Sequence, residues 1–144
     1  WALAITRRES AFRHDAYSSA GARGLMQILP STAKKLDGKG NWRRLNNPSV
    51  NVRLGTYYLG RLKHRFENNW LLATASYNAG YYRVKEWLPE EPMEADAWIE
   101  TIPYYETRDY VKAVLSYQQI YRMLGGKEDN LFEDVIDMKI VGSE

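Results

Sequence analysis

The sequence predicts a single globular domain that is mainly helical, with little or no β-sheet. Three observations predict this class. Apolar residues recur at intervals of three and four along most of the chain, and glycine and proline fall at the ends of these periodic segments. The length of 144 residues, with 44% hydrophobic residues, suits one domain with a sizeable core.

The first periodic segment places a carboxylate among apolar residues. The residues at helical spacing are Trp1, Ile5, Glu9 and Phe12. They predict a helix with Glu9 on its apolar face. Gly21 and Gly24 then predict a turn before residues 25–29.

Proline and glycine mark the ends of the next two predicted helices. Pro30 suits the start of a short helix that carries Ala33 and Leu36, and the turn formers at 37–40 should end it. After Pro48, a long amphipathic helix is predicted from the apolar series Val52, Gly55, Leu59, Leu62 and Phe66.

The second half predicts four more helices. Residues 70–79 form one helix, which Gly80 caps. Residues 84–88 form a short helix that ends at Pro89, and residues 95–101 form another that ends before Pro103. Residues 111–124 trace a long last helix that Gly125 and Gly126 end. We expect residues 1–125 to form the functional domain and residues 126–144 to be a tail, docked on the domain or including a short strand.

Composition excludes several classes of function. There is no cysteine and only two histidines, so we expect no disulfide, no metal site and no cofactor. A net charge of +2 is too small to indicate a nucleic-acid partner, although a mildly acidic polymer fits. No apolar run is long enough for a membrane span. The chain begins at Trp1, so we expect upstream domains and any signal peptide to lie outside it.

Glu9 is the first candidate for catalysis. Burying an unpaired carboxylate costs several kcal/mol, unless it is protonated or hydrogen-bonded. A general acid gives a reason for that burial, because desolvation raises the pKa of a glutamate until it holds a proton near neutral pH. Periodicity alone favours the plainer alternative, in which Glu9 pairs with Arg7 or Arg8 or faces solvent.

Four motifs change that balance. They are Glu9-Ser10-Ala11-Phe12, Gly24-Leu25-Met26-Gln27, Ser76-Tyr77-Asn78-Ala79-Gly80, and Ile102-Pro103-Tyr104-Tyr105-Glu106-Thr107-Arg108 followed by Tyr110-Val111. In this order, over residues 1 to about 124, the motifs resemble those of the soluble lytic transglycosylase family. Any one of them alone would carry little weight.

The resemblance implies a lysozyme-like, mainly helical domain of the α+β lysozyme superfamily, with a groove for a glycan strand. The family's catalytic glutamate matches Glu9. The same comparison implies that Met26 supports the groove wall and that five further residues lie at or near the groove. These five are Ser18, Gln27, Tyr77, Asn78 and Glu106.

Each of these residues also has a structural explanation. The amides of Gln27 and Asn78 can bind acetamido groups or brace the nearby backbone, and Ser18 can be a turn residue. Tyr77 can stack on a sugar or fill the core. Glu106 is favoured near a helix start by the helix dipole, with or without substrate.

The sequence departs from the family pattern at three places. Phe12 stands where tryptophan is common, Leu29 replaces a frequent methionine, and Tyr81 and Tyr82 replace Pro-Gly. These changes leave Glu9 in place but affect the groove contacts and the register of the glycan.

The family resemblance implies cleavage of peptidoglycan between N-acetylmuramic acid and N-acetylglucosamine without water, leaving 1,6-anhydro-N-acetylmuramic acid ends. One alternative is a goose-type lysozyme, in which water attacks. Another is a module that binds peptidoglycan without turnover. The expected partner is the glycan strand, and the expected location is the periplasm, either free or anchored to the outer membrane through a preceding segment.

Overall fold

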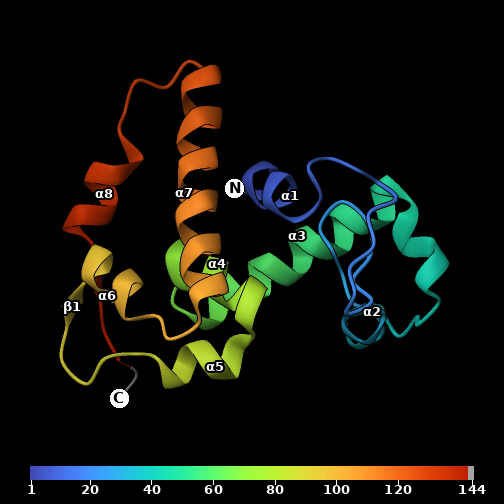
Figure 1. Cartoon of the computed structure of the whole chain (residues 1–144), viewed down its shortest axis with the longest axis horizontal. Coiled ribbons are helices and arrows are strands. Elements are labelled where there is room, and N and C mark those ends of the chain that lie inside the picture. Colours follow the sequence, from blue (N-terminus) through green and yellow to red (C-terminus); the bar gives the residue numbers. More distant parts are fainter. Residues whose placement is uncertain (143–144) are drawn as a thin grey trace. The chain divides into compact units, whose positions relative to one another are not determined.

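The computed structural model describes residues 1–142 and confirms the mainly helical class (Figure 1). The chain divides into two compact units, residues 1–61 and the residues from 62 onward. The boundary falls inside α3 (Pro48–Arg65), which is one continuous helix as predicted from Pro48. The two units are described in turn.

The first unit begins with α1 (Ala2–Ser10). Ala4 and Ile5 are completely buried, so these residues anchor the helix in the core of the unit. The predicted continuation of α1 to Phe12 is wrong. Ala11 and Phe12 have φ values of 49° and 64°, so the backbone turns left-handed directly after Ser10, and the Phe12 ring is exposed.

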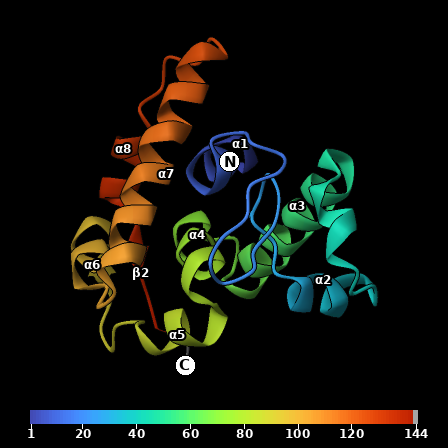
Figure 2. The same ribbon diagram turned by 45° about the vertical axis from the view of Figure 1, so that its right-hand side comes forward.

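Residues 11–29 form a long loop that folds back on itself beside α1 (Figure 2). Arg23 forms antiparallel bridges with both Tyr17 and Ile28, which hold the loop together. Helix α2 (Pro30–Asp37) follows and ends at Gly38, with φ 78°, as the turn formers predicted. A 3-10 helix, η1 (Trp42–Asn46), occupies a segment for which the sequence predicted only a loop.

The second unit is built around α4 (Trp70–Ala79) and α7 (Tyr105–Leu124), which pack on each other. In the sequence, α5 (Tyr81–Glu86) and α6 (Ala95–Thr101) lie between these two helices. Gly80 has φ 94° and ends α4 as predicted. The centre of this core contains the fully buried side chains of Trp98, Ile102, Val111 and Val114.

The segment after Gly126 contains a helix that the sequence did not predict. Helix α8 (Leu131–Asp137) packs on α6 and α7, and both views show it beside α7 (Figures 1 and 2). Strand β2 (Lys139–Ile140) then pairs antiparallel with β1 (Met93–Glu94), with Met93 opposite Ile140. The end of the predicted tail, residues 143 and 144, lies outside the described residues.

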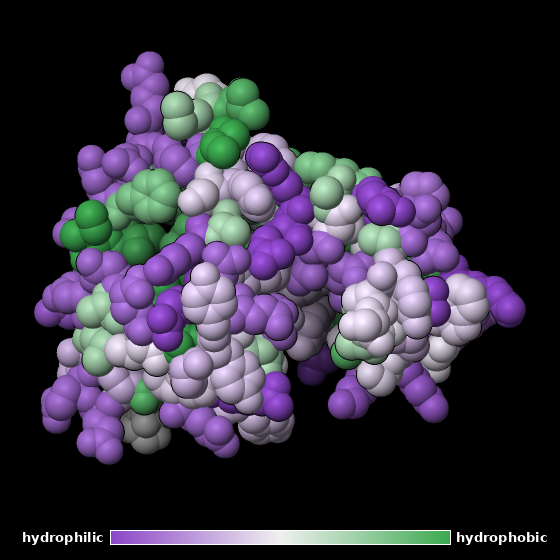
Figure 3. Space-filling view, in the orientation of Figure 1, coloured by the Kyte–Doolittle hydropathy of each residue, from purple (hydrophilic) through white to green (hydrophobic). Residues whose placement is uncertain are grey.

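Exposed apolar side chains gather over the end of α7 and over α8 (green in Figure 3). These side chains are Ile120, Met123, Leu124, Phe132 and Ile136. None of the helices in residues 1–142 is long and apolar enough to cross a bilayer.

Candidate active site

Glu9 lies in the last turn of α1 and is half-buried. The residues of α1 that are completely buried are Ala4 and Ile5, five and four positions before Glu9. Glu9 therefore lies at the margin of the first unit's core, where partial burial limits its contact with water. This position suits a group that must exchange a proton with a bound ligand.

Ser10 ties the end of α1 to the loop that follows. Its hydroxyl lies 2.7 Å from the Leu25 carbonyl oxygen and 3.1 Å from that of Thr6. Ser10 is 8% exposed, so this contact is shielded from water. Because Ser10 directly follows Glu9, the same contact fixes the backbone beside the carboxylate relative to the loop.

Asn51, from α3, organises the loop from the other side. Its Oδ1 accepts a hydrogen bond from the Met26 amide at 2.7 Å, and its Nδ2 donates to the carbonyls of Arg23 and Leu45 at 2.8 Å each. Asn51 is completely buried. One side chain thus replaces the water that the loop backbone would otherwise need.

The approach of the loop to Asn51 explains the glycine of the second motif. Gly24 has φ 78°, and a Cβ there would lie 2.3 Å from Asn51 Nδ2 and 2.4 Å from the Leu45 carbonyl oxygen. Any larger residue would displace the loop. Met26 is completely buried and packs on Gly55, where a Cβ would lie 2.4 Å from the Met26 sulfur. Met26 therefore acts in this loop by packing.

The Gln27 side chain braces the loop and keeps one hydrogen-bond acceptor, its Oε1, for a ligand. Its Nε2 donates to the carbonyl oxygens of Gly24 at 2.8 Å and Ala16 at 3.0 Å, so both amide hydrogens are used. Within residues 1–142 no hydrogen bond reaches its Oε1. Its φ of 50° is an unusual conformation for a non-glycine residue and holds the side chain in this orientation.

Ser18 serves a turn in this structure. Its Oγ accepts a hydrogen bond from the Ala22 amide at 3.0 Å, and its own amide donates to the Ala22 carbonyl at the same distance. The side chain is half-buried and stabilises the hairpin between Tyr17 and Arg23. Its predicted place at the groove stays a prediction.

In the second unit, Asn78 and Glu106 come together, although 28 residues separate them. Asn78 Nδ2 lies 3.4 Å from Glu106 Oε1, a long contact, and the Thr107 hydroxyl donates to Asn78 Oδ1 at 2.8 Å. Thr107 is 1% exposed, whereas Glu106 is exposed in the first turn of α7. Thr107 therefore orients the amide, and Glu106 contacts its outer edge.

Tyr77 precedes Asn78 on α4 and is half-buried, beside Ser76, which is completely buried. The two tyrosines that depart from the family pattern have different environments. Tyr81 packs on Phe66 with a centroid distance of 5.0 Å and lies under the Arg65 guanidinium at 3.4 Å. Tyr82 is 73% exposed.

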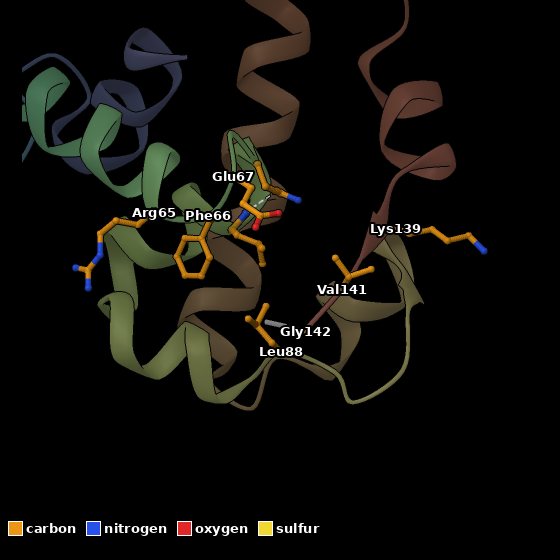
Figure 4. A pocket seen from close by; sticks show the side chains of 9 residues that line it. Arg65, Phe66, Glu67, Leu88, Lys139, Val141 and Gly142 are labelled. Carbon is orange, nitrogen blue, oxygen red and sulfur yellow. Dashed lines mark hydrogen bonds between the residues drawn. The ribbon is translucent and has the colours of Figure 1, made fainter. Parts of the chain in front are cut away.

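A pocket in the second unit lies between the end of α3 and the last described residues (Figure 4). The apolar side chains of Phe66, Leu88 and Val141 line it, while Arg65 and Lys139 extend away from it at its two sides. None of the predicted site residues lines this pocket. It is therefore distinct from the Asn78 and Glu106 pair.

Glu9 gives the first unit a side chain that can carry out acid-base chemistry. No group of three or more His, Asp or Glu side chains within residues 1–142 is placed to hold a metal ion. In the first unit, Glu9 lies beside a braced loop that presents the Gln27 acceptor. Such an arrangement can donate a proton to one polar group of a ligand while the loop holds another.

Sequence reasoning named Glu9 and Gln27 but missed the residues that support them. Ser10 and Thr107 were within the quoted motifs, yet their spacing gave no role to either hydroxyl. Asn51 had a detectable signal, because it is a polar residue three positions before the buried Leu54 on the inner face of α3. A buried asparagine on such a face indicates that it satisfies backbone groups of a neighbouring segment.

Comparison with known proteins identifies the family of this chain. The transglycosylase SLT domain family matches residues 1–99, and the soluble lytic transglycosylase helical domain family matches residues 101–129. A soluble lytic murein transglycosylase from Salmonella typhimurium is 42% identical over 142 residues, which cover 93% of this chain and 22% of that protein.

Two crystal structures are also similar. An inactive glutamate-to-glutamine mutant of a lytic transglycosylase from Pseudomonas aeruginosa is 44% identical, with a TM-score of 0.86 over 91% of this chain and 22% of that one. The soluble lytic transglycosylase of 70 kDa from Escherichia coli is 40% identical, with a TM-score of 0.85 over 90% of this chain and 22% of that one. The chain thus spans about a fifth of the length of these relatives. With a family match over 99 of its 144 residues and two similar structures at 40% identity or more, the chain belongs to the transglycosylase SLT family.

Proposed function

We propose that this chain is the catalytic part of a lytic transglycosylase, which cleaves the β-1,4 bond between N-acetylmuramic acid and N-acetylglucosamine in peptidoglycan. The observation that carries the proposal is the position of Glu9. It is half-buried at the end of α1, and its neighbour Ser10 is bonded to the loop that carries Gln27. Family membership and the lytic transglycosylase activity for which the relatives are named support the same reaction.

The reaction uses one carboxyl group twice. Glu9 donates its proton to the glycosidic oxygen, which leaves as the 4-hydroxyl of N-acetylglucosamine. The 2-acetamido carbonyl of the muramic acid supports the anomeric carbon as the bond breaks. Glu9, now ionised, takes the proton of the muramic acid 6-hydroxyl, whose oxygen closes the 1,6-anhydro ring. The proton returns to Glu9, and no water is consumed.

The other predicted residues are assigned supporting roles. Gln27 offers its Oε1 to an N–H donor such as an acetamido group, and Asn78, fixed by Thr107, offers its amide edge to the sugars. Tyr77 and Glu106 are proposed to contact the glycan strand. Ser18 and Met26 are proposed to support the loop that carries Gln27. The strand itself is the proposed partner, and the periplasm, where peptidoglycan lies, is the proposed site of action.

Mass analysis of the products tests the proposal. Purified peptidoglycan digested with the protein should yield fragments that end in 1,6-anhydro-N-acetylmuramic acid, one water lighter than the hydrolysis products and not reducible by borohydride. Glu9→Gln keeps the size of the side chain but cannot cycle a proton. We therefore expect the rate to fall by at least about 10²-fold, with unchanged far-UV circular dichroism.

Each alternative has its own result. Fragments with reducible muramic acid ends would show that water attacks, as in a goose-type lysozyme. Binding to peptidoglycan without release of soluble fragments would show that the chain is a binding module without turnover. Turnover of the Glu9→Gln variant within about tenfold of the parent would remove Glu9 from the acid role.

A further inference from the structure

In the loop that carries Gln27, the Arg23 side chain stacks on two aromatic rings, Tyr17 of the same loop and Trp42 of η1. Its guanidinium carbon lies 3.9 Å from the centroid of the Tyr17 ring and 4.2 Å from that of Trp42. Both rings are accessible, with 61% of Tyr17 and 39% of Trp42 exposed. The stacked guanidinium keeps its hydrogen-bonding groups in its own plane, at the edges that the rings do not cover.

This guanidinium lacks an anionic partner. Within residues 1–142, no carboxylate lies at ion-pair distance from Arg23, and no side chain or carbonyl accepts a hydrogen bond from it. Its Nε is buried without any hydrogen-bond partner. The two terminal Nη nitrogens have no hydrogen-bond partner among the described residues either, but they are not buried, so a ligand that accepts hydrogen bonds can reach them.

The charge of the surrounding unit favours an anion. Residues 1–61 contain eleven Lys and Arg against three Asp and Glu, a formal charge of +8. Residues 62–144 contain nine against fifteen, a charge of −6. Of the three carboxylates in the first unit, Asp15 pairs with Arg13, and Asp37 pairs with Arg44 and Arg53. The excess positive charge of this unit attracts anionic ligands to it.

The loop geometry links Arg23 to the proposed groove residues. The Arg23 amide and carbonyl exchange hydrogen bonds with Ile28 at 3.0 Å each and so close the turn that contains Gln27. Tyr17 pairs with Arg23 across the loop and directly precedes Ser18. Arg23 and Gln27 therefore belong to the same closed turn, and the backbone of one is fixed relative to the other.

We propose that Arg23, with the rings of Tyr17 and Trp42, forms a site for a carboxylate of the peptide stems that peptidoglycan carries on its muramic acid residues. The site rests on the proposed function, because it assigns part of the same substrate. A planar guanidinium matches the two oxygens of a carboxylate, and the accessible ring surfaces suit the alkyl part of a stem. The site would distinguish strands that carry charged stems from bare strands.

Binding measurements separate this role from a purely structural stack. In the Glu9→Gln background, which prevents turnover, three disaccharide ligands are compared by titration calorimetry. One carries a peptide stem with free carboxylates, one carries the same stem with the carboxylates converted to amides, and one has no stem. We expect the free-carboxylate ligand to bind about tenfold more tightly than the other two.

Arg23→Gln should abolish this preference and leave the affinity for the bare disaccharide within about twofold. Arg61→Gln is the matched control, because it removes one exposed positive charge of the same unit outside the stack, and it should keep the preference. If Arg23→Gln fails to fold, Arg23→Lys keeps the charge without the planar fork. That variant should lose most of the preference.

The outcomes also separate this inference from the proposed function. Equal loss of affinity for all three ligands in a folded Arg23→Gln variant would make the stack structural. No preference in the Glu9→Gln parent would remove the site, even if 1,6-anhydro products form. Absence of those products in the parent with Glu9 intact would overturn the proposed function, whatever the binding data show.

Discussion

Thr107 illustrates how a single buried hydroxyl can set the orientation of a proposed groove residue, Asn78. Its Oγ1 donates to Asn78 Oδ1, which leaves the Nδ2 of the amide directed toward Glu106. Without such a contact, the side-chain amide of an asparagine can flip and exchange its oxygen and nitrogen positions at little cost in free energy. Thr107 is therefore a positioning residue for Asn78.

Thr107→Val keeps the shape of the side chain but removes this hydrogen bond. We expect kcat on peptidoglycan to fall by about 5- to 10-fold, because one neutral hydrogen bond contributes about 1 kcal/mol to the orientation. Thr107→Ser restores the hydroxyl and should bring kcat back to within about twofold of the parent. Equal activity of the Val and Ser variants would limit Thr107 to packing.

At the scale of elements, an ion pair joins Asp37, the last residue of α2, to Arg44 of η1. Arg44 donates to Asp37 from both terminal nitrogens, Nη1 at 3.1 Å from Oδ1. The hydrogen bond from Arg44 holds the pKa of the Asp37 carboxyl below its usual value. The ionised form is thus favoured by folding, so its contribution to stability is present above the unfolded pKa of about 3.9 and is lost as the pH falls through the folded pKa.

Asp37→Asn tests this assignment. The difference in the free energy of unfolding between the parent and the variant should be largest near neutral pH and shrink below about pH 4, as measured by urea denaturation across a pH series. Asp15→Asn is the control, because the Arg13 and Asp15 side chains are 71% and 62% exposed and their pair contributes little. A difference that stays constant down to pH 3 would contradict the assignment.

Helices whose ends are marked by glycine or proline could be predicted from the sequence, and helices without such markers could not. The helices 70–79 and 95–101 begin and end where the sequence predicted, because Gly80 and the segment before Pro103 mark their limits. Helix α8 was missed because it buries only Leu131 and Val135, too few positions to show a period. The end of α1 was missed because apolar spacing carries no information on the φ of Ala11.

The candidate site follows the same division. Side chains that carry the motifs, such as Glu9 and Gln27, could be named from the sequence. The hydrogen bonds that fix them could not, because Asn51 reaches the loop across 25 residues of sequence, and the contact of Thr107 with Asn78 spans 29. Long-range polar contacts leave no periodic pattern, whereas amphipathic helices do.

At the scale of the molecule, α3 belongs to both compact units. Asn51 and Leu54 are buried before the boundary, and Leu62 after it. Gly60 lies just before the boundary in the middle of the helix, exposed and with no atom within 4 Å of the place of a Cβ. Glycine in a helix interior is less favourable than alanine by about 0.5–1 kcal/mol.

Gly60→Ala should therefore stabilise the protein by about 0.5–1 kcal/mol in urea denaturation, with no effect on cleavage of peptidoglycan. Gly55→Ala is the opposite case on the same helix, because its Cβ would overlap the Met26 side chain, and it should destabilise the protein. A destabilised Gly60→Ala variant would show that α3 needs flexibility at this position.

The passage of α3 across the boundary also determines what hydrogen exchange reports. In an α-helix each amide bonds to the carbonyl four residues earlier, so the amides of residues 62–65 depend on acceptors in residues 58–61. When the first unit opens, these amides lose their acceptors even if the second unit stays folded. Their protection factors therefore follow the less stable of the two units, and comparing them with the amides of α7 measures how far one unit opens without the other.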